Sequence, residues 1–405
     1  MGFHHGLSGL NAASKSLDVS GHNIANSNTI GFKKSRAEFN EMVASAMGSG
    51  QCPGSAGAGI GVSVAAVTQQ FSQGVITPTA NGLDMAINGD GFFVVNTPSG
   101  TAYTRNGAFQ LDKNGFLVTA NGDKVQGWAD ANATGTQPVD LQFPTGAGIP
   151  GRQTTGLSIQ AANLPATAPD AISVTPNTPR HTYGTSLQVY DSQGVAIPVE
   201  VYFVKNGSNT WDVYDTLDPA VTTPVGQVTF DGEGKFVSST VTGLNVDPSA
   251  ANPNNPPAPF NVTLDLSGMT QNDRKWSVDK MTQDGYASGE LTGVNVSKDG
   301  TLMASYSNGL TRPEGKVALA RFTNPQGLAP NGNNNWVQTN DSGPVLYGSA
   351  GAGSFGQIQG AALEESNVDL TAELVGMMTA QRSYQANAQT IKTQDQVFST
   401  LVNLR

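Results

Sequence analysis

Seven-residue apolar periodicity marks both ends of this 405-residue chain and is missing from the long region between them. The N-terminal stripe consists of Phe3, Leu10, Leu17 and Ile24, with Leu7 at an intermediate position. The C-terminal stripe advances in steps of four and three residues through Leu370, Leu374, Met377, Tyr384, Ala388, Ile391, Phe398 and Val402, with Gln381 and Asp395 as polar interruptions. This spacing predicts an amphipathic helix at each end, the second one with a coiled-coil seam. Ser366 and Asp369 are both candidate caps for its start.

The region between the helices is rich in turn signals and short β-forming runs. Asn-Gly and Asp-Gly pairs, such as Asn106-Gly107 and Asp231-Gly232, supply the positive φ angles that tight hairpins need. We therefore expect a mainly β fold with α-helical termini, in which nested antiparallel β domains are combined with a terminal-helix coiled-coil domain. A lone helix with so narrow an apolar stripe is marginally stable in water. The two ends should therefore pack on each other or on further copies, although a helical hairpin that covers one domain is the alternative.

The division into helical ends and a β region predicts four parts of the chain. Residues 1–32 and 364–405 would form the helical domain, and residues 33–70 a flexible connecting segment. Small residues and Cys52 occupy positions 44–61 of that segment. Residues 71–145 with 286–360 would form an inner β domain, and residues 146–285 an outer one.

Composition excludes several classes of function. The net charge is −10 and only 13% of residues are charged, which argues against nucleic-acid binding. A single cysteine excludes internal disulfides and cysteine-based zinc sites. No run of apolar residues is long enough to span a membrane, and no cleavable secretory signal is visible, which fits either a cytosolic protein or one exported without a cleaved signal.

We expect neither a catalytic site nor a bound cofactor or metal. The segment from Gly351 to Gly356 matches G-x-G-x-x-G, which in a dinucleotide site opens a helix that is followed by a parallel strand. Here residues 357–360 come first, and the terminal helix that follows them leads to no strand, so a hinge before that helix is the better interpretation. His22 and His181 have no nearby nucleophile with a matching acid, and the adjacent His4 and His5 point to different helix faces and are poorly placed to chelate a metal. The sequence therefore indicates a protein that is not an enzyme.

The terminal segments carry more specific motifs than their periodicity. The N-terminal run Asn23-Ile24-Ala25-Asn26-Ser27-Asn28-Thr29-Ile30-Gly31-Phe32-Lys33 resembles the signature of the bacterial flagellar axial proteins, the rod and hook group. The C-terminal runs 362–370 and 381–387 agree with it, as do inner blocks such as 103–109. The residues that match this family signature are Asn23, Ala25, Asn26, Thr29, Gly31, Phe32, Ser366, Asn367, Asp369, Gln381, Arg382 and Tyr384.

The resemblance implies a structural role in a polymer. Rod proteins are typically shorter, and residues 146–285 would be the additional outer domain of a hook subunit, so the resemblance favours the flagellar hook over a rod subunit. It implies a helical homopolymer that forms the flexible tubular joint between rod and filament. It also implies contacts with the rod, the hook cap, the hook–filament junction proteins and the flagellar export apparatus, and a place in the extracellular hook attached to the basal body. A secreted β-rich adhesin is a weaker alternative, because it leaves the terminal motifs unexplained.

The apolar stripes are the candidate assembly surfaces of such a polymer. Their members are Phe3, Leu7, Leu10, Leu17, Ile24, Leu370, Leu374, Met377, Tyr384, Ile391, Phe398 and Val402.

Overall fold

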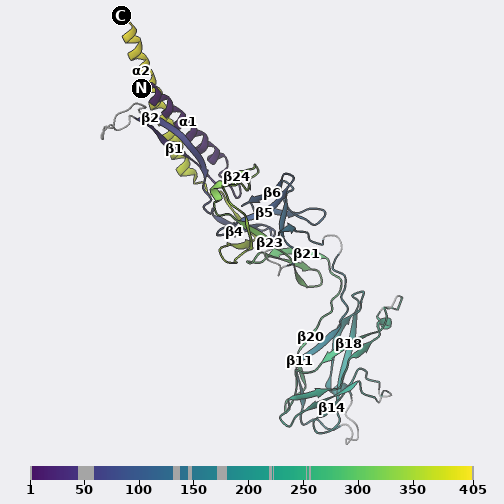
Figure 1. Cartoon of the computed structure of the whole chain (residues 1–405). Coiled ribbons are helices and arrows are strands. Elements are labelled where there is room, and N and C mark those ends of the chain that lie inside the picture. Colours follow the sequence, from purple (N-terminus) through teal and green to yellow (C-terminus); the bar gives the residue numbers. More distant parts are fainter. Residues whose placement is uncertain are drawn as a thin grey trace. The chain divides into compact units, whose positions relative to one another are not determined.

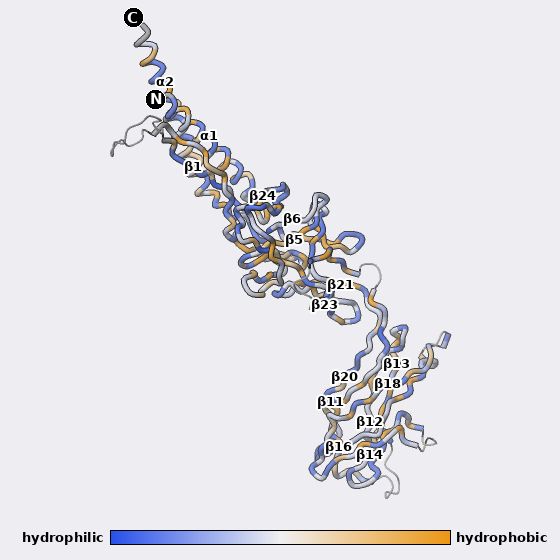
Figure 2. Tube along the Cα trace, viewed as in Figure 1, coloured by the Kyte–Doolittle hydropathy of each residue, from blue (hydrophilic) through white to orange (hydrophobic). Residues whose placement is uncertain are grey.

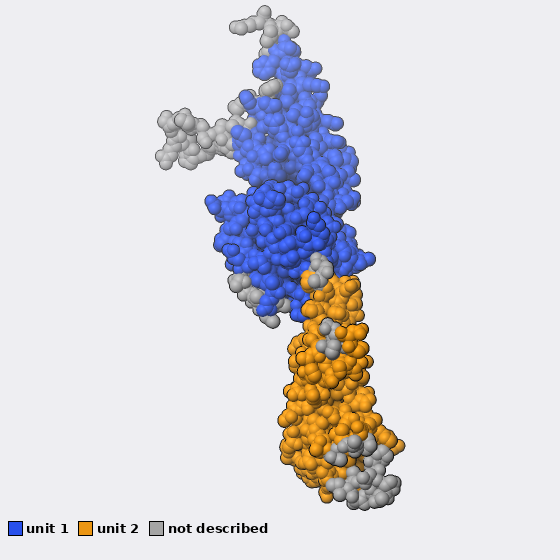
Figure 3. Space-filling view, turned by 90° about the vertical axis from the view of Figure 1, so that its right-hand side faces the viewer, with its two compact units in different colours: residues 1–143, 293–305, 311–405 blue, residues 144–292, 306–310 orange. Residues whose placement is uncertain are grey.

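The structure, a computed structural model, describes most of the chain. The described residues are 2–43, 59–130, 137–144, 148–170, 180–218, 221, 223–251, 253–254 and 257–403. Cys52 and the stretch 44–58 lie outside them. The chain folds into two compact units, coloured separately in Figure 3. Unit 1 contains residues 1–143, 293–305 and 311–405, and unit 2 contains residues 144–292 and 306–310.

Two long helices at the chain ends lie side by side in unit 1 (Figure 1). Helix α1 spans Gly2–Ala25, and helix α2 spans Leu370–Asn403. Gly6 is next to Ile391 and Gly9 is next to Asn387, so the helices run antiparallel. Asp369 caps α2, because its Oδ1 accepts hydrogen bonds from the backbone N–H groups of Thr371 (2.9 Å) and Ala372 (3.2 Å). The choice that the sequence left open between Ser366 and Asp369 is thereby decided.

The expectation of a flexible segment over residues 33–70 is wrong for the part that the structure describes. Strands β1 (Ser35–Val43) and β2 (Gly59–Gln69) pair antiparallel and pack along α1. The pairing runs from Ser35 opposite Gln69 to Val43 opposite Gly59, with two register shifts. Strand β2 alternates small and β-branched residues, and such residues fit a pleated surface against a helix.

The centre of unit 1 is a twelve-stranded sheet with the main order β21-β22-β23-β9-β5-β6-β25-β24. Strands β10 and β26 pair with β9 and β23, and the β7–β8 hairpin joins through β9. Hydrophobic and hydrophilic residues alternate along the helices and are mixed in the sheet region (Figure 2). The strands are β5 (Phe92–Thr97), β6 (Gly100–Thr104), β7 (Phe109–Leu111), β8 (Leu117–Thr119), β9 (Lys124–Trp128), β10 (Val139–Asp140), β21 (Leu291–Val296), β22 (Thr301–Tyr306), β23 (Thr311–Arg321), β24 (Ala329–Pro330), β25 (Asn335–Val337) and β26 (Leu346–Ser349).

Two short ladders bring the C-terminal part of the chain back to its N-terminal part. Strand β27 (Gln357–Gly360) pairs with β4 (Met85–Asn88), and β28 (Ala362–Glu364) pairs with β3 (Ile76–Pro78). The G-x-G-x-x-G segment is the turn between β26 and β27, with Gly351 and Gly353 at positive φ. The short helix η3 (Pro325–Gly327) precedes β24.

Unit 2 consists of two five-stranded sheets around one core. One contains β11 (Gly156–Pro165), β17 (Leu244–Val246), β18 (Phe260–Asp265), β19 (Met269–Asn272) and β20 (Ser277–Gln283). The other is the meander of β12 (Gly184–Tyr190), β13 (Ala196–Lys205), β14 (Thr210–Tyr214), β15 (Gly226–Phe230) and β16 (Phe236–Ser239). The helices η1 (Arg180–Tyr183) and η2 (Pro248–Ala250) lie in its connections.

One feature of unit 2 departs from antiparallel pairing. Strand β11 runs parallel to β18 and β19. Parallel neighbours need a long crossover, and here the whole meander lies between β11 and β18 in the chain. The mainly β fold with helical termini is confirmed.

The unit boundaries differ from the expected domains in two respects. The terminal helices and the inner β region, expected as separate domains, belong to one unit. The turn at residues 306–310 belongs to unit 2, because the Ser307 N–H donates to Glu290 O (2.8 Å) and Asn308 Nδ2 donates to Ala287 O (2.7 Å).

Candidate functional site

The helical pair buries two small residues of α1 and leaves its large apolar residues half-buried or exposed. On α1, Gly6 and Ala13 are buried, whereas Leu10, Leu17 and Ile24 of the predicted stripe are intermediate and Leu7 is exposed. A Cβ atom at Gly6 would lie 2.9 Å from Ile391 Cγ1. The close approach of the two helices therefore depends on glycine at this position.

The C-terminal stripe divides between two environments. Met377 and Ile391 are partly covered, with Ile391 packed on α1. Leu370, Leu374, Tyr384 and Phe398 are exposed. The side chains of Phe3 and Val402 lie outside the described residues. Some residues of the predicted assembly set are thus partly covered within one chain, whereas others remain on its surface.

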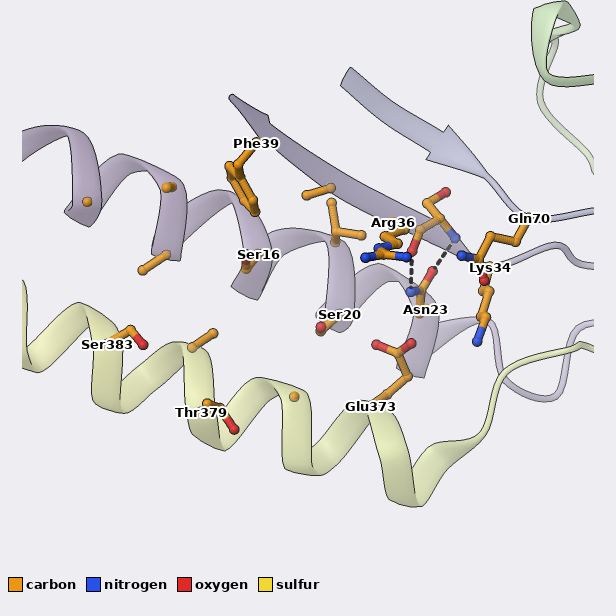
Figure 4. A pocket seen from close by; sticks show the side chains of 18 residues that line it. Ser16, Ser20, Asn23, Lys34, Arg36, Phe39, Gln70, Glu373, Thr379 and Ser383 are labelled. Atoms are coloured by element: carbon orange, nitrogen blue, oxygen red, sulfur yellow. Dashed lines mark hydrogen bonds between the residues drawn. The ribbon is translucent and has the colours of Figure 1, made fainter. Parts of the chain in front are cut away.

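A groove of about 610 Å³ opens between α1, α2 and β1 (Figure 4). Small residues of both helices face it, among them Ala12 and Ser16 of α1 and Gly376 and Ala380 of α2. Phe39 of β1 lines the same groove. Because the side chains opposite one another are small, the helices do not fill the space between them.

The signature residue Asn23 fixes the start of strand β1 at one end of this groove. Its Oδ1 accepts a hydrogen bond from the Ser35 backbone N–H (2.9 Å), and its Nδ2 donates to the Ser35 carbonyl (2.8 Å; Figure 4). Asn23 is 1% exposed. The asparagine amide therefore replaces a strand partner for this residue.

The rest of the N-terminal signature shapes the turn after α1, which ends at the exposed Ala25. Asn26 Nδ2 donates to the His22 carbonyl (2.9 Å), and Thr29 Oγ1 donates to Asn26 Oδ1 (3.3 Å). Gly31 has φ +68°, and a Cβ there would lie 2.6 Å from the Arg105 backbone carbon. Only glycine fits this close approach to the β domain.

The C-terminal signature meets this turn through Asn367. Its Oδ1 accepts from the Lys34 N–H (2.7 Å), and its Nδ2 donates to the carbonyls of Gln70 (2.8 Å) and Ser72 (3.1 Å). Phe32 is buried and accepts a backbone hydrogen bond from Asn367 (3.4 Å). One side chain thereby connects segments that lie about 300 residues apart in the sequence.

A buried ion cluster lies at the same junction. Glu364 Oε1 accepts from Lys33 Nζ at 2.6 Å, and Glu364 Oε2 accepts from Arg105 at 3.0 Å. The side chains of Lys33 and Glu364 are fully buried, and that of Arg105 is 5% exposed. Lys33 Nζ also donates to the Ser72 carbonyl (2.7 Å), and Glu364 Oε1 also accepts from the Gly74 N–H (2.9 Å). We call Lys33, Arg105, Glu364 and Asn367 the clasp.

Burial governs the electrostatics of the clasp. Desolvation lowers the pKa of Lys33 below its ordinary value, Arg105 adds to this effect, and the charge of Glu364 opposes it. Arg105 Nε is buried without a hydrogen-bond partner among the described residues. Such a cluster adds little net stability relative to apolar packing, but removing one member leaves an uncompensated buried charge. The clasp therefore holds the geometry of this junction.

Other signature residues lie apart from the clasp. Ser366 is buried and accepts a hydrogen bond from the Val368 N–H (3.4 Å), whereas Asp369 caps α2. Gln381, Arg382 and Tyr384 are exposed on α2. The signature therefore serves both the junction and a free helix surface.

Sequence reasoning did not select Lys33, Arg105 or Glu364 as site residues. Each stands inside a motif that supported the family resemblance, and charged residues are almost never fully buried unless paired. Their positions in motifs were a usable signal, but nothing in the spacing indicated that they meet.

Within the described parts of the chain, no three or more His, Cys, Asp or Glu residues come together as a metal site would require. Neither described helix is long and apolar enough to cross a membrane.

Comparison with known proteins places these segments in one family. Four family models match: "Flagella basal body rod protein" at residues 3–33, "Flagellar hook protein FlgE/F/G D1 domain" at 86–166, "Flagellar basal body protein FlaE D2 domain" at 162–286, and "Flagellar basal body rod FlgEFG protein C-terminal" at 359–404.

Two relatives that match over the full length are flagellar hook proteins. The chain is 42% identical to the flagellar hook protein FlgE of Escherichia coli K12, with 100% of both chains covered. It is 32% identical to the FlgE of Borreliella burgdorferi, with 99% of both covered. Among solved structures, the Helicobacter pylori flagellar hook protein FlgE2 has a similar fold, with a TM-score of 0.50, 16% identity, and coverage of 71% of this chain and 100% of that one.

Proposed function

The chain belongs to the flagellar hook protein family, and we propose that it polymerises through the exposed face of its helical pair while the clasp holds that pair on the β domain. It is a structural subunit of the flagellar hook attached to the basal body, and it is not an enzyme. The rod-subunit and adhesin alternatives are not favoured, because the full-length relatives are hook proteins.

An uncovered apolar stripe on α2 carries the proposal. Leu370, Leu374 and Met378 follow one another at intervals of four residues and are 44%, 49% and 53% exposed. Residues at this spacing share one helix face. Large apolar patches left exposed in a soluble subunit mark interaction sites. In a homopolymer, such a stripe is covered by a neighbouring copy.

Unit 2 provides the outer domain in this proposal. It has its own core, and the segment 146–285 carries six of the ten net negative charges of the chain. Like charges on facing copies oppose association, so we expect its contacts to be weaker and more replaceable than those of the helices. Contacts with the rod, the hook cap, the hook–filament junction and the export apparatus belong to the same proposal.

Leu374→Asp tests the helical surface. Because Leu374 is half exposed and turned away from α1, we expect the stability of the monomer to change by no more than about 0.5 kcal/mol. Polymerisation should be lost, because a neighbour would have to bury an unpaired carboxylate. Sedimentation and electron microscopy of the purified full-length chain measure the polymer, and circular dichroism checks the fold.

The matched control is Thr393→Asp, which places the same charge on α2 about 100° around the helix from Leu374. Thr393 is exposed. Normal tubes from Leu374→Asp, or equal loss from both variants, would contradict the assignment of this stripe to assembly.

A further inference from the structure

Helix α2 extends past the start of α1 (Figure 1). Ile391 packs on Gly6, which is four residues from the start of α1 at Gly2. Phe398 lies seven residues farther along α2, a distance of about 10 Å, whereas α1 continues for only about 6 Å. We call residues 395–403 the overhang.

Phe398 continues the α1-facing stripe beyond α1. A spacing of seven residues keeps it on the same helix face as Ile391. It is 65% exposed, the same exposed fraction as Val75 and above that of the other exposed large apolar residues described. Val397 is also exposed, at 54%, but one residue is a turn of about 100°, so it points away from that stripe. The Phe398 side chain at this end of the stripe is therefore largely uncovered by the described residues.

The groove has unfilled space, whereas the overhang carries an uncovered large side chain. At the other end of the helical pair, the same interface contains Ala12, Ser16, Gly376 and Ala380, and a space of about 610 Å³ remains between the helices. Phe39 supplies an aromatic wall. One end of the stripe thus has an uncovered large side chain, and the other has unfilled space.

The charges of the groove and of the overhang also favour contact between these two surfaces. Lys34, Arg36 and Glu373 are the charged residues that line the groove, which leaves one net positive charge. None of them forms an ion pair within 4.0 Å among the described residues. Asp395 is the charged residue of the overhang, and the C-terminal end of a helix carries partial negative charge.

We infer that the overhang of one copy inserts Phe398 into the groove of the next copy. The inference rests on the proposed function and specifies one contact within it. Because the two surfaces differ and lie at opposite ends of the helical pair, the contact is head-to-tail and does not close, so repetition generates an open helical polymer.

A disulfide tests the contact directly. In a Cys52→Ser background, the pair Ser16→Cys and Phe398→Cys should cross-link copies in polymers under mild oxidation and yield a ladder of covalent multimers. The control pair Asp18→Cys and Phe398→Cys places the thiol on the other side of α1 and should yield no ladder, because a disulfide needs Cα atoms about 4.4–6.8 Å apart.

Two single variants keep the test independent of cysteine chemistry. Phe398→Ala should raise the polymer's critical concentration about tenfold or more, and Val397→Ala should change it less than about threefold. Ala12→Leu, which fills the groove, should match Phe398→Ala.

The outcomes separate the two proposals. Polymers that form with an unchanged critical concentration in Phe398→Ala, or cross-linking that is equal in both cysteine pairs, would overturn the groove contact and leave the proposed function intact. Failure of the unchanged chain to polymerise at all would overturn the proposed function.

Discussion

Large apolar side chains are buried in the core of unit 2 but are half-buried or exposed in the helical pair of unit 1. Unit 2 encloses them, with Trp211, Ile159 and Leu164 at 0% exposure. The helical pair buries Gly6 and Ala13, and leaves Leu374 and Phe398 on the surface. Burial of apolar area is the main stabilising contribution to a fold. The core of unit 2 therefore forms within one chain, whereas in the proposed polymer the helices would gain much of their stabilisation from neighbouring copies.

The clasp differs from the helical pair, because its three charged groups form ion pairs within a single copy. It buries three charges at the base of the helices, and the half-buried amide of Asn367 is hydrogen-bonded beside them. The helices are therefore anchored at one end and incomplete along their exposed faces. In the proposed polymer, the clasp would fix one end of the surface that neighbouring copies cover.

Removing the carboxylate of the clasp should have the largest effect on a single copy. Glu364→Ala leaves Lys33 and Arg105 buried without their counter-charge, and we expect unit 1 to lose about 3–5 kcal/mol of stability. Hydrogen exchange read peptide by peptide distinguishes unit 1 from unit 2. The neighbouring exposed Glu365→Ala should cost less than about 0.5 kcal/mol. A loss below about 1 kcal/mol for Glu364→Ala would mean that the clasp is not a stabilised junction.

A cavity in unit 2 should have an effect that polymerisation does not change. Ile159→Ala removes a fully buried side chain from the core, and we expect a loss of about 2–5 kcal/mol. Exchange in unit 2 should accelerate to a similar extent in monomers and in polymers. Strong protection of the variant core on polymerisation would show that unit 2 also depends on its neighbours, which would remove the contrast between the two units.

We expect the smallest effect on stability at alkaline pH, where Tyr103 influences unit 1. Burial raises the pKa of Tyr103 above its ordinary value, and the hydrogen bond to the Tyr347 hydroxyl (3.3 Å) adds to this. The unfolded chain releases this proton near pH 10 while the folded chain keeps it, so the stability of unit 1 should be full below pH 10 and fall above it.

Tyr103→Phe should weaken that decline and cost no more than about 1 kcal/mol at pH 7. Urea unfolding between pH 8 and pH 11 measures both quantities. Tyr202, whose pKa is raised to about 12 mainly by burial, remains in both proteins and serves as an internal reference in unit 2. Identical pH profiles for the two proteins would contradict the assignment.

The contrast between the helices and the β units was visible in the sequence only as a change of period. The seven-residue stripes located α1 and α2, and the turn dipeptides located the β region, because helix and strand periods depend on local spacing. The terminal motifs identified the family. Strands β1 and β2 were mistaken for parts of a flexible segment, since their pairing is stabilised by contact with α1 and their own sequence pattern is weak.

Tertiary structure decided which partner each residue meets. Periodicity defined a stripe on α2, but only the register with α1 showed that Ile391 is covered and Phe398 is not. Lys33 and Glu364 are 331 positions apart, and Arg105 and Glu364 are 259 apart. Such contacts depend on how the whole chain returns to its start through β27 and β28, whereas the sequence by itself determined the local elements and the family to which the chain belongs.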